Sequence, residues 1–175
     1  LYNPGDSDLV VQVQTAAGPQ PDITIPPMSA ARYPETGPVL PTASGVLFTS
    51  ADPARIFYGV GALDADSAQD WGYALVPEGF ASTQALIGWA PGNNNSPPNG
   101  DESRVYVTAL GPTEVFVDFD HDGTADDSRV VTAALQEVAF DNYDDLTCAK
   151  LYTTDGVPFL AVWGQDQGSP PALPS

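Results

Sequence analysis

The chain has 175 residues, of which 42% are hydrophobic, so it can bury a sizeable core and is not expected to be disordered as a whole. Its formal net charge of −18 arises from 23 acidic side chains against five basic ones, too few to build the phosphate-neutralising face that nucleic acid requires. We therefore exclude nucleic acid as a partner, and we expect no direct membrane insertion, because no apolar run approaches the roughly 20 residues of a membrane span.

Short stretches rich in β-branched and aromatic residues recur along the whole chain, whereas no dozen-residue window keeps a helical period free of Gly and Pro. The only candidate helix is a short one at 133–137. The fold is therefore predicted to be almost entirely strand and loop. In chain order, we expect strands over 9–14, 23–25, 29–33, 46–49, 55–61, 71–76 and 84–89, and then over 105–109, 114–119, 129–132, 136–140, 149–153 and 159–163.

The polar tract PGNNNSPPNGDES at 91–103 is the best candidate for an internal boundary in the chain. We interpret 1–175 as a single all-β domain with possible pseudo-repeat lobes 1–92 and 103–175. The tract is then either a linker between the lobes or a long surface loop.

An internal repeat supports two lobes. GVLFTSADPARIFYGVGALD at 45–64 lies over AKLYTTDGVPFLAVWGQD at 149–166, and LVVQVQT at 9–15 lies over TEVFVDF at 113–119, both at an offset near one hundred residues. The predicted fold class is an antiparallel β-sandwich built from two repeated four-strand units, each covering the apolar side of the other. Chance similarity between β-rich stretches is the alternative explanation.

The segment VFVDFDHDGTADDSRVV at 115–131 carries the clearest chemistry. Calcium takes six or more oxygen ligands, and carboxylates at positions 1, 3 and 5 of a compact loop converge on one point. A glycine at position 6 permits a sharp turn, position 7 offers a backbone carbonyl, and position 9 offers a carboxylate directly or through water. We therefore predict calcium as the cofactor, with these ligands: Asp118, Asp120, Asp122, Thr124 and Asp126.

Position 12 of this loop is Arg129 instead of a bidentate glutamate, and strands are expected on both sides, so a helix-loop-helix site is disfavoured. The alternative is an Asp-rich turn without an ion, whose side chains cap its own backbone. Five carboxylates within ten residues repel one another unless a cation neutralises them, which favours the metal. The other acidic segments, 64–70 and 140–147, fit solvated turns better than a tight metal loop.

An enzymatic role is not expected. The only histidine, His121, lies inside the acidic loop and is poorly placed to act as the base of a nucleophilic triad. A two-carboxylate glycosidase is compatible with the composition, but no spacing nominates a pair. The alternative binding function is a carbohydrate-binding sandwich that uses exposed Trp71, Trp89 and Trp163, although such aromatics are more often core residues. Cys148, the only cysteine, is expected to be a small buried thiol in a strand.

The spacing D-x-D-x-D-G-x-x-D between two strands resembles the calcium loops of integrin-type FG-GAP repeats, and over these nine residues the resemblance implies a metal and not a propeller fold. More broadly, the chain resembles a repeated β-rich region of very large bacterial surface or adhesin-like proteins, and is distantly similar to the N-terminal region of IgGFc-binding-type proteins. The segments that carry this resemblance are LYNPGDSDLVVQV, FTSADPARIFYGV, DWGYALVP, IGWAPG, VFVDFDHDGTAD and LYTTDGVPFLAVWGQD.

The resemblance implies a secreted, cell-surface protein with a structural or adhesive role, and it does not imply antibody binding. The partners it suggests are neighbouring domains or copies of the same chain in a surface assembly, with glycans as a further possibility. Within this class, a self-assembling filament subunit is an alternative, in which an unpaired edge strand such as 9–15 adds to a neighbour's sheet.

Overall fold

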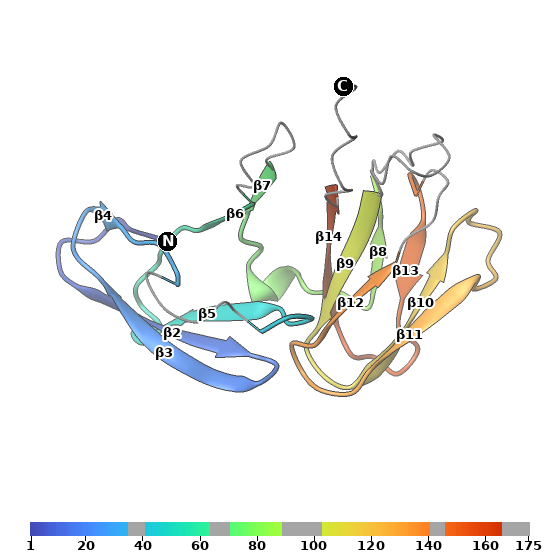
Figure 1. The fold of residues 1–175 in the computed structure, drawn as a ribbon, viewed down its shortest axis with the longest axis horizontal. Helices are drawn as coiled ribbons and strands as arrows, with labels where there is room; N and C mark the ends of the chain where they lie inside the picture. Colours follow the sequence, from blue (N-terminus) through green and yellow to red (C-terminus); the bar gives the residue numbers. More distant parts are fainter. Residues whose placement is uncertain (35–40, 64–70, 89–102, 141–145, 166–175) are drawn as a thin grey trace, which may run out of the picture.

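The structure, a computed structural model, describes residues 1–34, 41–63, 71–88, 103–140 and 146–165 (Figure 1). Over these residues the fold is all-β, as predicted, with antiparallel pairing throughout and a single three-residue 3-10 helix, η1 (Glu78–Phe80). The strands are β1 (Tyr2–Asn3), β2 (Leu9–Thr15), β3 (Gly18–Ile25), β4 (Ser29–Ala30), β5 (Val46–Ser50), β6 (Val60–Leu63), β7 (Trp71–Ala74), β8 (Gln84–Leu86), β9 (Ser103–Ala109), β10 (Thr113–Asp118), β11 (Asp127–Val131), β12 (Glu137–Phe140), β13 (Lys150–Tyr152) and β14 (Phe159–Gln165).

Strands β8–β14 form the C-terminal lobe, which is built like a β-sandwich (Figure 1). A four-stranded sheet, β11-β10-β13-β8, faces a three-stranded sheet, β12-β9-β14, and alternate side chains of both sheets point inward. The two sheets share one hydrophobic core, in which Val107, Val115 and Leu151 are completely buried. This core anchors β10, the strand that leads into the acidic loop.

Strands β1–β7 form the N-terminal lobe, which has a smaller core of its own. In the sheet β3-β2-β5, the regular alternation of buried and exposed side chains along β2 turns Leu9 and Val11 inward, where they pack with Ile23 and Ile25 of β3. The short pair β1-β4 and the hairpin β6-β7 complete the lobe. We expected one repeat to cover the other, whereas the sheets that face each other across the larger core both lie in the C-terminal lobe.

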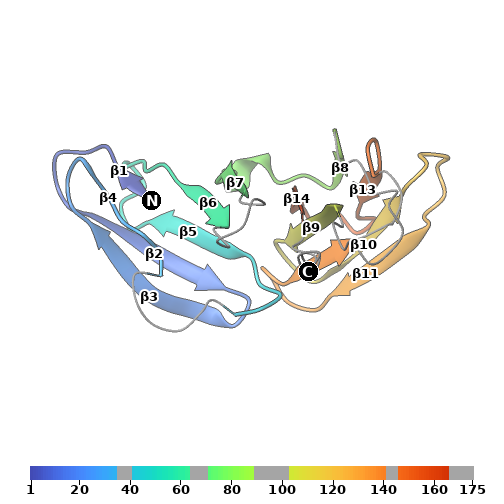
Figure 2. The same cartoon turned by 45° about the horizontal axis from the view of Figure 1, so that its top comes forward.

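The lobes lie side by side along the long axis of the molecule (Figures 1 and 2). A short antiparallel contact joins them: the Gly45 N–H donates to the Leu135 carbonyl at 2.8 Å, and the Glu137 N–H donates to the Ala43 carbonyl at 3.0 Å. The backbones approach closely here, because a Cβ on Gly45 would lie 2.3 Å from Cγ2 of Thr108. Glycine is therefore required at this position by space and not by an unusual φ.

The predicted repeat has a counterpart in the strand order. The sheet β3-β2-β5 of the N-terminal lobe has the same order as β11-β10-β13, to which the repeat aligns it. The aromatic strand that ends each predicted unit pairs outside this three-stranded set, β6 with β7 and β14 with β9. Strand β8 precedes the expected boundary yet is an edge strand of the C-terminal four-stranded sheet. The division into two repeated four-strand units and the lobe boundaries therefore stay predictions, and the tract 91–103 lies almost entirely outside the described residues.

Two local expectations were wrong. The stretch at 133–137 is not a helix, because Leu135 adopts a left-handed φ of 63° and Glu137 already begins β12. Cys148 is exposed and lies in the turn before β13 with a φ of 71°, so it is neither buried nor in a strand. Its neighbours Leu146 and Ala149 occupy the buried positions instead. In the described part of the chain, no helix has the length and apolar character needed to cross a membrane.

Candidate metal centre

The hairpin β10-β11 positions the acidic loop. The two strands pair from Thr113↔Val131 to Val117↔Asp127, and residues 119–126 connect the end of β10 to the start of β11. Because Val115 and Val117 are buried in the core, the end of β10 is held firmly, and Asp118 is its last residue. The loop lies at the end of the C-terminal lobe that is farthest from the N-terminal lobe (Figures 1 and 2).

Inside the loop, the backbone turns so that its N–H groups point at the Asp118 carboxylate. His121 and Gly123 both have left-handed φ values, 62° and 94°, and glycine adopts this conformation at little cost. The Asp122 N–H donates to Oδ1 of Asp118 at 3.1 Å, and the Gly123 N–H donates to Oδ2 at 2.9 Å. Asp118 is only 1% exposed, so these bonds compensate a buried carboxylate and fix its orientation.

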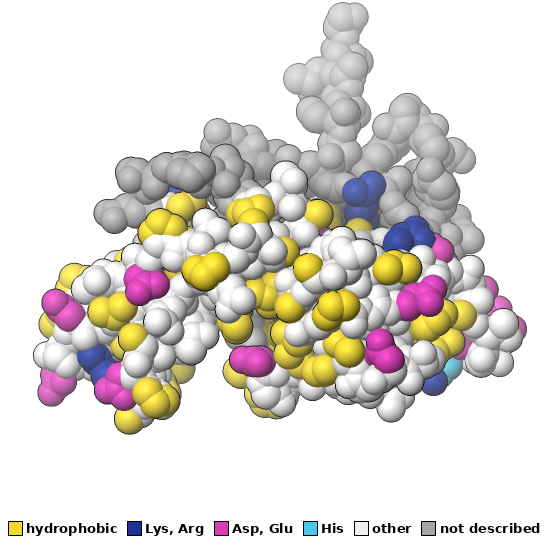
Figure 3. Space-filling model, turned by 90° about the horizontal axis from the view of Figure 1, so that it is seen from below, with side chains coloured by type: hydrophobic (Ala, Val, Ile, Leu, Met, Phe, Trp, Pro, Cys, Tyr) yellow, Lys and Arg dark blue, Asp and Glu magenta, His cyan; other side chains and the backbone are white. Residues whose placement is uncertain are grey.

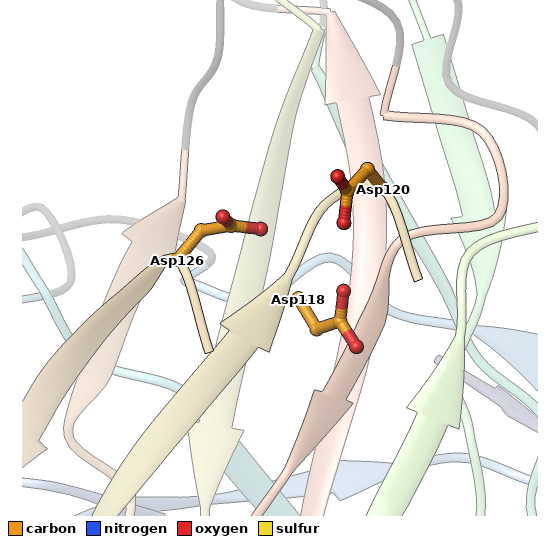
Figure 4. Close-up of side chains that lie close together, drawn as sticks. All are labelled: Asp118, Asp120 and Asp126. Carbon is orange, nitrogen blue, oxygen red and sulfur yellow. The ribbon is translucent and has the colours of Figure 1, made fainter. Parts of the chain in front are cut away.

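Three carboxylates converge on one point. Oxygens of Asp118, Asp120 and Asp126 all lie within 4.8 Å of one another, and Figure 4 shows the three side chains turned toward a common space. Asp120 and Asp126 are exposed, whereas Asp118 forms the floor of the cluster. Asp126 is held in place by the Phe119 N–H, which donates to its Oδ2 at 2.7 Å.

The two remaining predicted ligands are not part of this triad. The Oδ1 atom of Asp122 accepts the Thr124 N–H at 2.7 Å, which is the side-chain-to-backbone bond of an Asp turn. Asp122 therefore uses its side chain to shape the loop. Its role as a ligand, and that of the Thr124 carbonyl, stay predictions.

The chemistry of the cluster suits a cation. Three carboxylates this close repel one another, and a positive ion placed between them removes that repulsion. An ionised carboxylate has about four lone-pair sites, and the two oxygens of Asp118 each accept one loop N–H, so sites remain for a metal. Among the described residues, this is the only group of three or more His, Cys, Asp or Glu side chains close enough to hold an ion together. The loop is thus a cluster that could hold a metal ion.

The charges around the cluster are mostly of the same sign. Acidic side chains are spread over both lobes, and few basic ones are visible (Figure 3). Next to the loop, Arg129 is already engaged by Asp127, with 2.6 Å between Nη1 and Oδ2. A second base, Lys150 of β13, lies directly opposite Asp118 across the sheet. Sequence spacing gave no signal for this neighbour, because the pairing joins residues that are 32 positions apart.

The fold and the loop together define an all-β protein with an acidic hairpin loop able to hold a metal ion. No known protein family, curated protein sequence or solved structure matches the chain. Function is therefore inferred from the site itself.

Proposed function

We propose that the chain is an extracellular calcium-binding module with a structural or adhesive role in a bacterial surface or filament protein. The observation that carries this proposal is the convergence of Asp118, Asp120 and Asp126 within 4.8 Å at the end of a core-anchored hairpin. A compact set of three carboxylates is a donor set for a cation, so we propose a binding role in preference to an enzymatic one.

Calcium is the metal that fits the donor set best. The cluster offers only carboxylate oxygens, which suit hard cations such as calcium and magnesium. Zinc and copper prefer nitrogen or sulfur ligands, and neither His121 nor Cys148 belongs to the triad. Between the two hard cations we propose calcium, because its coordination tolerates irregular geometry, whereas magnesium demands near-ideal octahedral geometry and retains several waters.

Metal binding would rigidify the hairpin. The loop joins β10 to β11, and β10 lies between β11 and β13 in the four-stranded sheet, so ordering the loop fixes one end of this sheet. A module of this kind transmits force or presents a surface better when its end is stiff. The high negative charge also fits a cation-rich setting outside the cell, where counterions screen self-repulsion. Neighbouring domains or copies of the chain are the proposed partners.

The tryptophan-based carbohydrate site receives no specific support. Trp163 is partly buried and packs against the larger core. Trp89 lies outside the described residues, and the side chain of Trp71 is not described either. A platform made by these three side chains stays a prediction.

A thermal melt tests the calcium proposal. The melt is recorded in millimolar calcium, in magnesium and in excess chelator, at fixed ionic strength so that simple charge screening is constant. A ligand at about 100 times its dissociation constant adds about 2.7 kcal/mol to the folded state, which corresponds to roughly 5–10 °C for a chain of this size. Identical melting temperatures in calcium and chelator would contradict the proposal, and an equal effect of magnesium would contradict the choice of metal.

A further inference from the structure

The single lysine and the single histidine of this acidic chain line the same pocket. The pocket has a volume of about 310 Å³ and is lined by Gln84, Ala85, Leu86, His121 and Lys150. The first three residues form β8, Lys150 begins β13, and His121 belongs to the acidic loop. Lysine and arginine together number only five in this chain, and one of these five lines the same pocket as the only histidine.

The strand register places this pocket beside the metal cluster. Lys150 is the cross-strand partner of Asp118 on one side and of Leu86 on the other. Directly opposed residues of antiparallel strands project from the same face of the sheet. His121 follows Asp120 in the chain, so the loop that carries the triad also forms one wall of the pocket.

The Lys150 ammonium contacts an aromatic ring and not a carboxylate of the described residues. It lies 5.4 Å from the centroid of the Tyr152 ring, a cation–π contact, and no acidic side chain of the described residues forms an ion pair with it. Tyr152 in turn stacks on Phe116 of β10, with ring centroids 5.4 Å apart and an angle of 21° between the rings. A lysine that pairs with no acidic side chain of the described residues and lines a pocket is available to an anion from outside.

The rest of the lining suits a compact, hydroxyl-rich ligand. The exposed Gln84 amide can both donate and accept hydrogen bonds. Leu86 is 63% exposed and offers an apolar wall. A pocket of about 310 Å³ is at the small end of the range for ligand sites. A sugar ring with one carboxylate presents all three kinds of group, hydroxyls, C–H bonds and a negative charge, within such a volume.

We propose that this pocket binds the carboxylate of an acidic sugar, with Lys150 as the main anion-binding residue, at the edge of the metal cluster. The inference rests on the proposed function, because it supplies the ligand class for an adhesive module. In this arrangement the Lys150 ammonium donates to the carboxylate, while Gln84 and His121 hydrogen-bond the hydroxyls. A divalent metal held by the neighbouring triad cancels most of the triad's negative charge, which lessens the repulsion of an anion in the pocket.

The experiment is an NMR titration of the full chain with two matched probes. Methyl glucuronoside carries a carboxylate where methyl glucoside carries a hydroxymethyl group. Each probe is titrated in calcium and in chelator, and a Gly-Glu-Gly peptide serves as a non-sugar carboxylate. We expect glucuronoside in calcium to shift the amides of 84–86, His121 and Lys150, with a dissociation constant at least tenfold below that of the glucoside.

Two variants identify the binding group. Lys150→Met keeps an apolar stem of similar length and removes the charge, and it is expected to weaken glucuronoside binding at least tenfold while calcium still binds. Arg32→Met removes one positive charge from the N-terminal lobe, and it should leave glucuronoside binding unchanged.

Three results would overturn the inference: equal binding of both glycosides, unchanged affinity in Lys150→Met, or tighter binding of the peptide than of the glucuronoside. Failure of the proposed function has a different signature, since the wild-type chain would then show no calcium response before any sugar is added. Glucuronoside binding that needs Lys150 but is unaffected by chelator would retain the pocket and remove the metal's contribution to it.

Discussion

The Asp120→Asn substitution distinguishes charge repulsion within the acidic loop from metal binding by it. The substitution removes one charge from the cluster and changes little else. The Oδ1 atom of Asp120 accepts the Asp122 N–H at 3.1 Å, and the side-chain oxygen of an asparagine can keep that bond. The substitution removes one of the three negative charges that lie within 4.8 Å of one another. The variant should therefore be more stable than the wild type without metal and less stabilised by calcium.

The size of the first effect follows from the geometry. Two unit charges 4.8 Å apart, the upper limit for the ligand atoms of the cluster, repel by about 0.9 kcal/mol in a water-like dielectric, and Asp120 has two such neighbours. At physiological ionic strength the Debye length of about 8 Å reduces this repulsion to roughly half. The gain in the free energy of unfolding is then about 1 kcal/mol, or about 2–4 °C in melting temperature for a chain of this length.

The second effect has the opposite sign. Loss of one carboxylate ligand should weaken calcium binding by about tenfold or more, which is about 1.4 kcal/mol of binding free energy. The assay is a set of thermal melts of wild type and Asp120→Asn across a calcium series. Asp22→Asn is the matched control, because it removes the same charge from an exposed position in β3 of the other lobe. A variant that melts like the wild type in chelator and keeps the full calcium response would refute both the repulsion and the ligand role.

Three further predictions concern the rest of the fold. Gly45→Ala should destabilise the chain by about 2–4 kcal/mol in urea unfolding, because its Cβ would overlap Thr108 and strain the contact between the lobes, and Thr108→Ala in the same chain should recover part of the loss. Asp155→Asn should be less stable than wild type near neutral pH, because the Val157 N–H and the Thr113 hydroxyl lower the pKa of Asp155 in the folded state. The difference should begin to shrink as the pH falls below the unfolded pKa of about 4 and disappear as it falls through the lower folded pKa. Burial raises the pKa of Glu137, so the folded state binds its proton more tightly than the unfolded state does. The free energy of unfolding should therefore fall as the pH rises from the unfolded pKa through the raised folded pKa. Glu137→Gln should flatten that fall, and an unchanged dependence of stability on pH would contradict the burial of the Glu137 carboxyl.

The acidic loop could be predicted from the sequence because its geometry is local. The spacing of Asp118, Asp120 and Asp126 within nine residues, with Gly123 between them, is enough to bring the three carboxylates together once the chain forms a hairpin. The role of the Asp122 side chain was harder to predict from the sequence. Whether an aspartate turns inward to a metal or caps its own turn depends on side-chain rotation, which spacing does not determine.

The neighbours of the loop could not be predicted, since they depend on strand register. Lys150 reaches Asp118 only because β13 pairs with β10, and Leu86 reaches Lys150 only because β8 pairs with β13. A shift of one residue would turn every one of these side chains to the opposite face. No local pattern distinguishes the two registers in strands of three residues.

Strand β3 shows why the length of a strand is hard to predict from a polar, proline-rich segment. We expected a strand only over 23–25, because 18–27 is rich in proline. The strand extends from Gly18 to Ile25 and includes Pro19 and Pro21. It is an edge strand, where a residue without an N–H can be tolerated on the unpaired side, and the register shift between Val11 and Val13 of β2 accommodates the irregularity.

The most direct test of the central claim is a calcium titration of the isotope-labelled chain followed by backbone NMR. The Asp122 and Gly123 N–H groups donate to the Asp118 carboxylate, so they report directly on any ion that carboxylate binds. The account predicts saturable shifts concentrated at 118–126, with one calcium bound per chain. Weak, non-saturating shifts spread over the acidic surface of both lobes would contradict it.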